Sequence, residues 1–146
     1  MTLRPSSLFS YALRALVDLS IHQVSGQVKV ASIAKRQEIP VQVLEQIFNR
    51  LRRKGLVVAE RGPRGGYRLS RQAKEIRVND IFESLESGKP SNGKKKPAGS
   101  DITVGLWRQV EKAVSATLEA TTLEALAAKA REQVPQPISH RFTFHI

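Results

Sequence analysis

The densest group of side chains able to bind a ligand by charge lies between residues 50 and 77. This stretch carries ten Lys or Arg against two Glu, a local charge of +8 in a chain whose formal charge is +11. The phosphates of a nucleic-acid backbone bind so dense a cluster of cations because condensed counterions are released. Basic residues at a helix end or in a turn are usually only solvated. Their number over so short a stretch nevertheless predicts nucleic-acid binding.

Two elements are expected to position these cations, a helix and a β-hairpin. Residues 40–54 carry apolar side chains at the 3.6-residue period of an amphipathic helix: Leu44, Ile47, Phe48 and Leu51. Gly55 stands where a glycine commonly ends a helix, directly after basic residues that complement the helix dipole. Strands over 56–59 and 67–69 then flank a glycine-rich turn with two arginines. A helix with a polar outer face followed by a basic hairpin predicts a winged helix-turn-helix.

Two further helices are expected upstream. Residues 7–22 show an apolar helical stripe, with Ser6 or Ser7 available as the N-cap. A second helix over residues 31–37 ends before Pro40, which suits the first turn of the next helix. The helix over residues 31–37 and the helix over residues 40–54 have the spacing of a helix-turn-helix. Val28 and Val30 indicate a short strand, from which Val28 can pair with the wing.

Beyond the wing we expect a helix over 79–87, a basic linker and a long helix. From residue 101, apolar residues recur every four positions, with one tryptophan beside them: Ile102, Leu106, Trp107, Val110, Val114 and Leu118. A break is expected near Ala120, with Thr121 and Glu124 as a capping box and a further helix from Thr122. The long helix has little of its own chain to bury against. Pairing with a second copy is therefore expected, and folding back onto its own domain is the alternative.

The predicted fold class is mainly α with a small β-wing, a winged helix-turn-helix head plus a long dimerisation helix. The expected divisions are a DNA-binding domain over 1–87, a flexible basic loop over 88–100, dimerisation helices over 101–134 and a C-terminal strand or tail over 135–146. The loop is assigned from its Gly, Pro and Lys content. The last segment is assigned from apolar residues that alternate with the period of a strand.

Composition narrows the class of protein. A pI near 10.6 favours polyanionic partners, nucleic acid first and an acidic membrane surface second. No apolar run approaches the ~20 residues needed to cross a bilayer, and the N-terminus lacks the cleavage site of a secretory signal, so a cytoplasmic protein is expected. The chain contains no cysteine, which excludes disulfides, thiolate zinc sites and cysteine-ligated iron–sulfur clusters.

No arrangement of residues predicts catalysis or a metal site. Of the three histidines, His140 and His145 fall on opposite faces of the predicted C-terminal strand, so they do not converge. The glycine-rich turn lacks the following Lys-Ser/Thr and the helix of a phosphate-binding loop. No Ser-His-Asp arrangement or carboxylate pair can be argued. We therefore expect no enzyme activity and no cofactor.

Four segments of the sequence indicate a particular protein family more specifically than composition or periodicity does. They are YALRALVDLS, LEQIFNRLRRKGLVVAERGPRGGYRLS, IRVNDIFESLE and TVGLW. Together they resemble the Rrf-type regulators, bacterial transcription factors that include IscR-like, NsrR-like and CymR-like proteins, over about residues 5–130. The resemblance implies a homodimer that binds a pseudo-palindromic DNA operator through winged heads and swapped or paired long helices.

The resemblance also implies roles for individual residues. Gln42, Glu45 and Gln46 match recognition-helix positions that approach base edges, and Arg61 matches a wing arginine that reaches the minor groove. Their chemistry agrees, because Gln pairs with adenine, Glu accepts from cytosine and a guanidinium favours a narrow minor groove. The remaining wing positions are Gly62, Pro63, Arg64, Gly65, Gly66 and Tyr67. Expected phosphate contacts are Ser32, Asn49, Arg50 and Arg53, and the expected dimer contacts are the six residues of the long-helix stripe.

One departure from the family pattern changes the expected control. Many relatives hold an iron–sulfur cluster with three cysteines before the long helix and often a histidine just before Leu-Trp. Here the loop is rich in lysine, and Val104 stands near the histidine position. We therefore expect a homodimeric sequence-specific regulator, a repressor without a cluster, controlled by an unidentified effector or protein partner. The alternatives are a scaffold that keeps the fold and regulates a partner enzyme, and a non-specific nucleic-acid binder.

Overall fold

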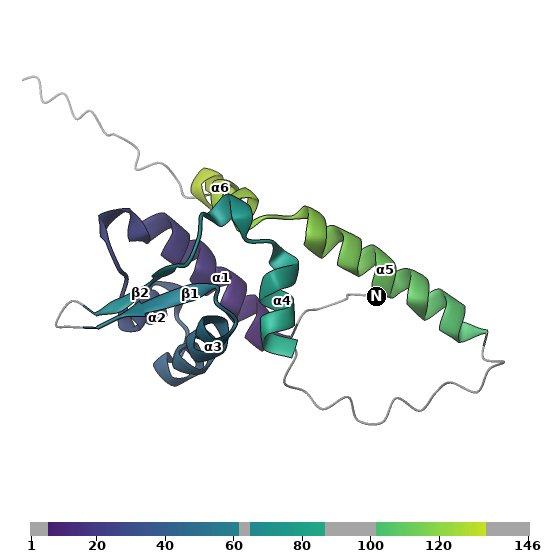
Figure 1. The fold of residues 1–146 in the computed structure, drawn as a ribbon, viewed down its shortest axis with the longest axis horizontal. Helices are drawn as coiled ribbons and strands as arrows, with labels where there is room; N and C mark the ends of the chain where they lie inside the picture. Colours follow the sequence, from purple (N-terminus) through teal and green to yellow (C-terminus); the bar gives the residue numbers. More distant parts are fainter. Residues whose placement is uncertain (1–5, 62–64, 87–101, 134–146) are drawn as a thin grey trace, which may run out of the picture.

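The computed structural model describes residues 6–61, 65–86 and 102–133. Helix α1 (Ser7–His22) runs through the centre of a head and contacts α2 (Val30–Gln37), α3 (Val41–Arg53), α4 (Val78–Glu86) and α6 (Leu123–Gln133). A hairpin of β1 (Val57–Glu60) and β2 (Gly66–Leu69) lies on one side of the head, whereas α5 (Thr103–Ala120) projects away from it (Figure 1). Short 3-10 turns cover Gln23–Ser25 (η1) and Ala73–Glu75 (η2). The predicted fold class, mainly α with a small β-wing, is confirmed.

The core of the head is formed by the apolar faces of α1, α2, α3, α4 and α6. Its largest fully buried side chains include Leu16 and Leu19 from α1, Ile81 and Leu85 from α4, and Leu123 from α6. The four apolar residues that predicted α3 are all buried: Leu44, Ile47, Phe48 and Leu51. Burial of each such side chain contributes about 1.5–3 kcal/mol relative to exposure. The core therefore holds α3 with its opposite, polar face toward solvent.

Capping residues set the ends of the helices. Ser6 is the N-cap of α1, and its Oγ accepts a hydrogen bond from the Phe9 backbone N–H at 3.3 Å. At the end of α3, Gly55 has φ of 74°, and its N–H donates to the Arg52 carbonyl at 3.0 Å. The Leu56 N–H donates to the Leu51 carbonyl, also at 3.0 Å, which completes a Schellman motif. Leu56 belongs to this motif, so β1 begins one residue later than predicted.

The wing is a two-stranded antiparallel sheet joined to the rest of the head at Val28. Its register pairs Val57 with Leu69 and Glu60 with Gly66. Val28 forms a bridge to Tyr67 through two backbone hydrogen bonds of 2.8 Å, which confirms the predicted pairing of Val28 with the wing. A Cβ at Gly66 would lie 2.4 Å from the Val28 carbonyl oxygen, so this close approach requires glycine. The prediction for Val30 is wrong, because Val30 is the first residue of α2 rather than part of a strand.

Helix α6 returns to the head. It contacts α1 and buries Leu123 and Ala127, so it contributes to the core of the head rather than extending α5. The predicted cap is wrong by one residue: Thr122 Oγ1 accepts from the Ala125 N–H at 3.1 Å. The Thr121 hydroxyl instead donates to the Thr117 carbonyl at 2.8 Å. The reason is tertiary, because a bridge between Thr122 and Arg77 places the turn into α6.

Candidate nucleic-acid interface

The three predicted base-reading residues lie on one face of α3. Gln42, Glu45 and Gln46 are all exposed and follow each other at positions i, i+3 and i+4, which share one side of a helix. The opposite side carries Leu44 and Ile47, which are fully buried. The core therefore presents amide and carboxylate groups to solvent along a rigid element, as required for hydrogen bonds to base edges in a major groove.

The predicted phosphate contacts are spread over α2 and α3, and two of them also have partners within the protein. Arg50 Nη1 donates to the Leu85 carbonyl at the end of α4, at 3.0 Å. Asn49 is half-buried, and its Oδ1 accepts from Arg52 at 2.9 Å. Ser32 is half-buried on α2, and Arg53 is exposed in the last turn of α3. Arg50 thus links α3 to α4, a contact that the sequence analysis missed.

The wing is attached to α3 by an aromatic contact. The Tyr67 and Phe48 rings have centroids 4.8 Å apart and planes tilted by 41°. Arg61 is exposed just after β1, and Gly65 and Gly66 are half-buried. Gly62, Pro63 and Arg64, also predicted wing contacts, lie outside the described residues. The structure therefore shows Tyr67 as a residue that holds the wing in a defined position relative to α3.

A buried carboxylate ties the first helix of the helix-turn-helix to α1. Asp18 is only 3% exposed. Arg36 Nε and Nη2 donate to its two oxygens over 2.6–3.2 Å, and Gln37 Nε2 donates at 2.9 Å. The hydrogen bond to Asp18 raises the pKa of the Arg36 guanidinium, although partial burial acts in the opposite direction. His22 completes the cluster, with Nδ1 3.4 Å from Asp18 Oδ1.

The sequence pattern does not predict this cluster. The available signal was a charged residue inside the apolar stripe of residues 7–22. Such a residue indicates a buried partner, because an unpaired buried charge is very costly. The partners lie 18 and 19 positions away on another helix, so periodicity within one helix could not identify them.

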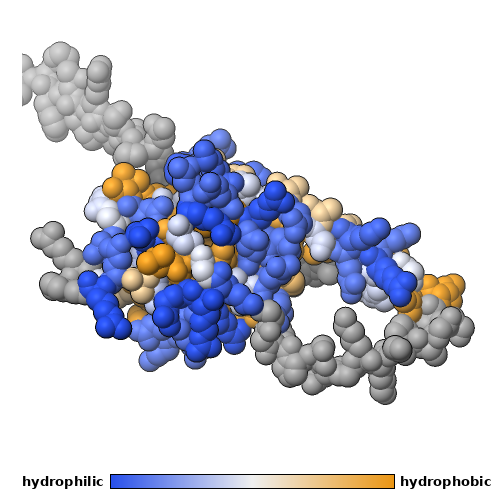
Figure 2. All heavy atoms as spheres, viewed as in Figure 1, coloured by the Kyte–Doolittle hydropathy of each residue, from blue (hydrophilic) through white to orange (hydrophobic). Residues whose placement is uncertain are grey.

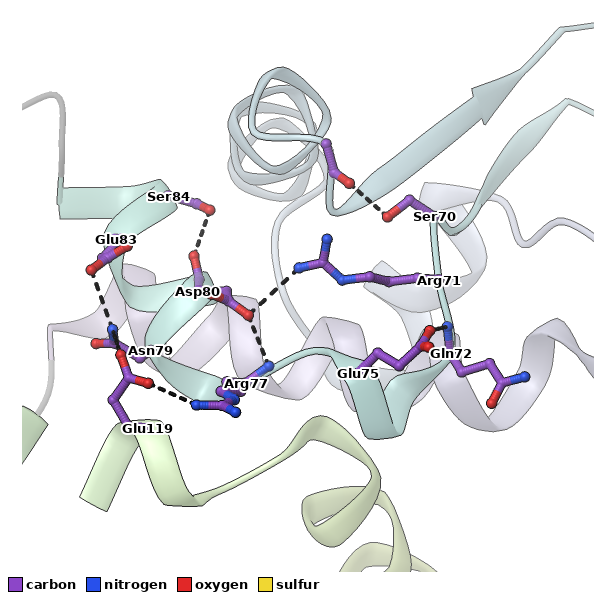
Figure 3. Close-up of polar contacts among 11 residues, drawn as sticks. Ser70, Arg71, Gln72, Glu75, Arg77, Asn79, Asp80, Glu83, Ser84 and Glu119 are labelled. Atoms are coloured by element: carbon purple, nitrogen blue, oxygen red, sulfur yellow. Dashed lines mark hydrogen bonds and ion pairs between the residues drawn. The ribbon is translucent and has the colours of Figure 1, made fainter. Parts of the chain in front are cut away.

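A second polar group fixes the direction in which α5 leaves the head (Figure 3). Glu119, near the end of α5, accepts from Arg77 Nη1 at 3.0 Å and from Asn79 Nδ2 at 2.7 Å. Backbone hydrogen bonds hold the connector: the Val78 N–H donates to the Thr121 carbonyl at 2.9 Å. The exposed side-chain pairs are individually weak. Together with the backbone hydrogen bonds, these side-chain pairs define one orientation for residues 121–122, which connect α5 to α6.

The described face of α5 is apolar and uncovered. Ile102 is 89% exposed, Leu106 59%, Trp107 55% and Val114 43%. Val110 and Leu118 are half-buried, and Leu118 packs against the core. Figure 2 shows apolar atoms at the end of α5 that is farthest from the head. Contiguous exposed apolar surface of this kind is uncommon on monomeric soluble proteins.

Within the described ranges, none of the helices has both the length and the apolar character needed to cross a membrane.

Comparison with known proteins decides the family. The Rrf2 family, described as an iron-dependent transcriptional regulator, matches residues 6–129. The chain belongs to this family. It is 37% identical over 129 residues to the HTH-type transcriptional regulator IscR of Serratia proteamaculans, which covers 85% of this chain and 79% of that protein. It is therefore a DNA-binding transcription regulator, as the resemblance implied.

Two solved structures show the same fold. The structure of T. potens IscR has a TM-score of 0.77 and 35% identity, and the match covers 93% of this chain and 95% of that one. The structure of CymR, the global cysteine regulator of B. subtilis, has a TM-score of 0.75 and 32% identity, over 88% of this chain and 98% of that one. Both solved structures are thus matched over most of their length.

The residues of this Rrf2-family chain do not fit an iron–sulfur cluster held by cysteines. Such clusters depend on thiolate ligands, and the sequence contains no cysteine. In the parts of the chain that the structure describes, no three His, Asp or Glu residues are grouped so that they could hold a metal ion. We therefore assign no step in the action of this regulator to an iron cluster.

Proposed function

We propose that this protein is a homodimeric, sequence-specific repressor that binds a pseudo-palindromic operator in the bacterial cytoplasm. The observation that carries the proposal is the exposed polar face of α3 together with a wing held against the same helix. Gln42, Glu45 and Gln46 are available on that face, and the contact between Tyr67 and Phe48 connects it to the wing. A recognition helix and a wing held in fixed relation can enter neighbouring grooves of one duplex.

The proposed contacts divide into those that read sequence and those that hold the backbone. The three residues of the α3 face would read base edges in the major groove, and Arg61 would enter the adjacent minor groove. Ser32, Asn49, Arg50 and Arg53 would contact phosphates, which position the protein without specifying sequence. The +8 charge of residues 50–77 supports this division, because it supplies cations well beyond those needed for base contacts.

The exposed stripe of α5 supports dimerisation. Leu106, Trp107 and Val114 face water in the isolated chain, and a second copy would cover them. Two heads related by a two-fold axis would then meet two half-sites related by the same symmetry. Because α6 packs on α1, we place the dimer contacts on residues 102–120 rather than on the whole of 101–134. A dimer bound across a promoter would block transcription, hence the proposed repression.

Selection of bound sequences from a random duplex pool tests the proposal. We expect one pseudo-palindromic consensus at ~150 mM salt, since non-specific binding is weak at that ionic strength. Gln46→Ala should then weaken binding to the consensus by about 1–3 kcal/mol and change binding to random duplex little. Arg61→Ala should weaken consensus binding more than about threefold and relax the preference at the flanks of the site.

The same measurements can contradict the proposal. Equal losses on consensus and random DNA would show that Gln46 does not read bases. The absence of any selected consensus would favour the alternative of a scaffold or a non-specific binder.

A further inference from the structure

A cavity of about 830 Å³ lies between α1 and α6 and reaches the end of α2. Its apolar wall is formed by Leu13, Val17 and Ile21 from α1, with Leu126 and Ala130 from α6. Figure 1 shows α6 lying across α1 on the side of the head away from α3. Sites for small molecules commonly occupy ~300–1,000 Å³ and have mostly apolar walls with a few convergent polar groups. This cavity has the size and wall chemistry of such a site.

The charged groups around the cavity are mainly cationic. Arg14, Arg36 and Lys129 line it, each from a different helix, and Asp18 is the carboxylate among the lining residues. The charge of Asp18 is already matched by Arg36, and Gln37 also donates a hydrogen bond to this carboxylate. Arg14 donates to the backbone carbonyl of Gln37, and Lys129 is exposed on α6. The surplus charge around the apolar wall is therefore positive.

We propose that this cavity binds a small amphipathic organic anion. A carboxylate or sulfonate would be held by Arg14 and Lys129, because guanidinium and ammonium groups form strong charge-assisted hydrogen bonds with such oxygens. The hydrocarbon or aromatic body of the ligand would cover the wall formed by Leu13, Val17 and Leu126. The positive surplus is what selects an anion over a neutral ligand of the same size.

The position of the site gives it a route to the DNA-binding surface. Arg36 and Gln37 belong to the last turn of α2, the first helix of the helix-turn-helix, and Asp18 holds both of them on α1. An anion held by Arg14 would compete with the Gln37 carbonyl for that guanidinium and so alter the contact between α1 and α2. Binding of ligand and of DNA would then be linked reciprocally. The linkage between anion binding and DNA binding rests on the proposed function, whereas binding of the anion itself does not.

Fluorescence titration of the full chain with anilinonaphthalene sulfonate tests the site, since this probe joins one sulfonate to an aromatic body. We expect about one probe per chain, and binding at least about tenfold weaker for the neutral analogue phenylnaphthylamine, which lacks the sulfonate. Ala130→Phe, which fills the cavity, should lower the affinity about tenfold or more. Its matched control is Ala125→Phe at an exposed α6 position that does not line the cavity, and it should change the affinity less than about twofold.

Two variants that each remove one positive charge distinguish binding in the cavity from general attraction of the probe to a basic protein. Lys129→Gln should weaken probe binding about tenfold, whereas Lys74→Gln, which removes an exposed cation outside the cavity, should not. The proposal is overturned if Ala130→Phe leaves binding unchanged, or if the neutral analogue binds as tightly as the anion. Failure of the full chain to bind the probe would also overturn it.

The effect on DNA is measured separately with operator duplex. Saturating probe should shift the operator Kd at least about threefold in the parent protein and leave it unchanged in the Ala130→Phe variant. An unchanged Kd in the parent would overturn the link to DNA. Loss of operator binding without any probe would instead count against the proposed function, so the two failures are distinguishable.

Discussion

Helices α1 and α5 are similar in length and both have an apolar stripe, yet their environments are opposite. Helix α1 has 16 residues, seven of which are buried in contact with four other helices. Helix α5 has 18 residues, and none of them is buried in the described part of the chain. The same periodicity therefore has two different structural outcomes. In α1 it builds the core of one chain, and in α5 it leaves a surface that another chain can cover.

The largest effect should come from opening the core beside α1. Phe48→Ala should lower the free energy of unfolding by about 3–5 kcal/mol, because it leaves a cavity and removes the ring that Tyr67 contacts. Urea unfolding followed by circular dichroism measures this loss. Val114→Ala on α5 is the control, and at dilutions where the chain is monomeric it should change the unfolding free energy by less than about 0.5 kcal/mol. A large loss in the control would contradict the contrast between the two helices.

Removing the α5 stripe should affect assembly rather than folding. The double variant Leu106→Ala/Trp107→Ala should raise the dimer dissociation constant at least about 100-fold, since two buried side chains of this size together contribute about 3 kcal/mol or more. Sedimentation equilibrium measures the constant. Gln109→Ala at an exposed α5 position outside the stripe is the control. If the double variant associates as tightly as the parent, the stripe is not the dimer surface.

Breaking the tie between α1 and α2 should have a smaller effect on the head. Arg36→Ala should cost about 2 kcal/mol of unfolding free energy, because the buried Asp18 carboxylate then keeps only its weaker partners. The cost stays below that of a fully buried pair, since the Arg36 side chain is 36% exposed. Arg36→Lys should recover part of the loss but not all of it, because an ammonium cannot form the bidentate contact. Equal unfolding free energies for parent and Arg36→Ala would show that the ion pair is energetically neutral.

The smallest effect should come from the junction between α5 and the head. A double-mutant cycle of Arg77→Gln and Glu119→Gln should give a coupling energy of only about 0.2–1 kcal/mol, because both side chains are about half exposed. The cycle uses thermal unfolding of all four proteins under one set of conditions. A coupling energy well above this range would show that the junction is more rigid than its exposure indicates.

The contrast between the helices also marks what the sequence could predict. Helix α1 was predicted at its observed bounds of residues 7 and 22, and the glycine that ends α3 was predicted from its position after three basic residues. These features depend on local periodicity and on backbone conformation, which are visible within a few residues. The recognition-helix face followed from the same pattern, because burial of one side of α3 determines which side remains exposed.

Features that depend on contacts between distant segments were not predictable in this way. The apolar residues of α6 could not indicate that α1 was the surface they cover. Asp18 and Arg36 lie on different helices, so no spacing rule connects them. The cap of α6 was misplaced because the bridge between Arg77 and Thr122 sets the turn. In each case a tertiary contact decided between local arrangements that the sequence pattern allowed equally.

The connection at Thr121 and Thr122 makes α5 a lever in the proposed dimer. An α-helix rises about 1.5 Å per residue, so the 18 residues of α5 span about 27 Å. A tilt of about 10° at the junction would move the far end by about 5 Å, more than the ~3.4 Å between successive base pairs. The angle set by Glu119 and the connector would therefore determine which spacing of half-sites the two heads can reach together.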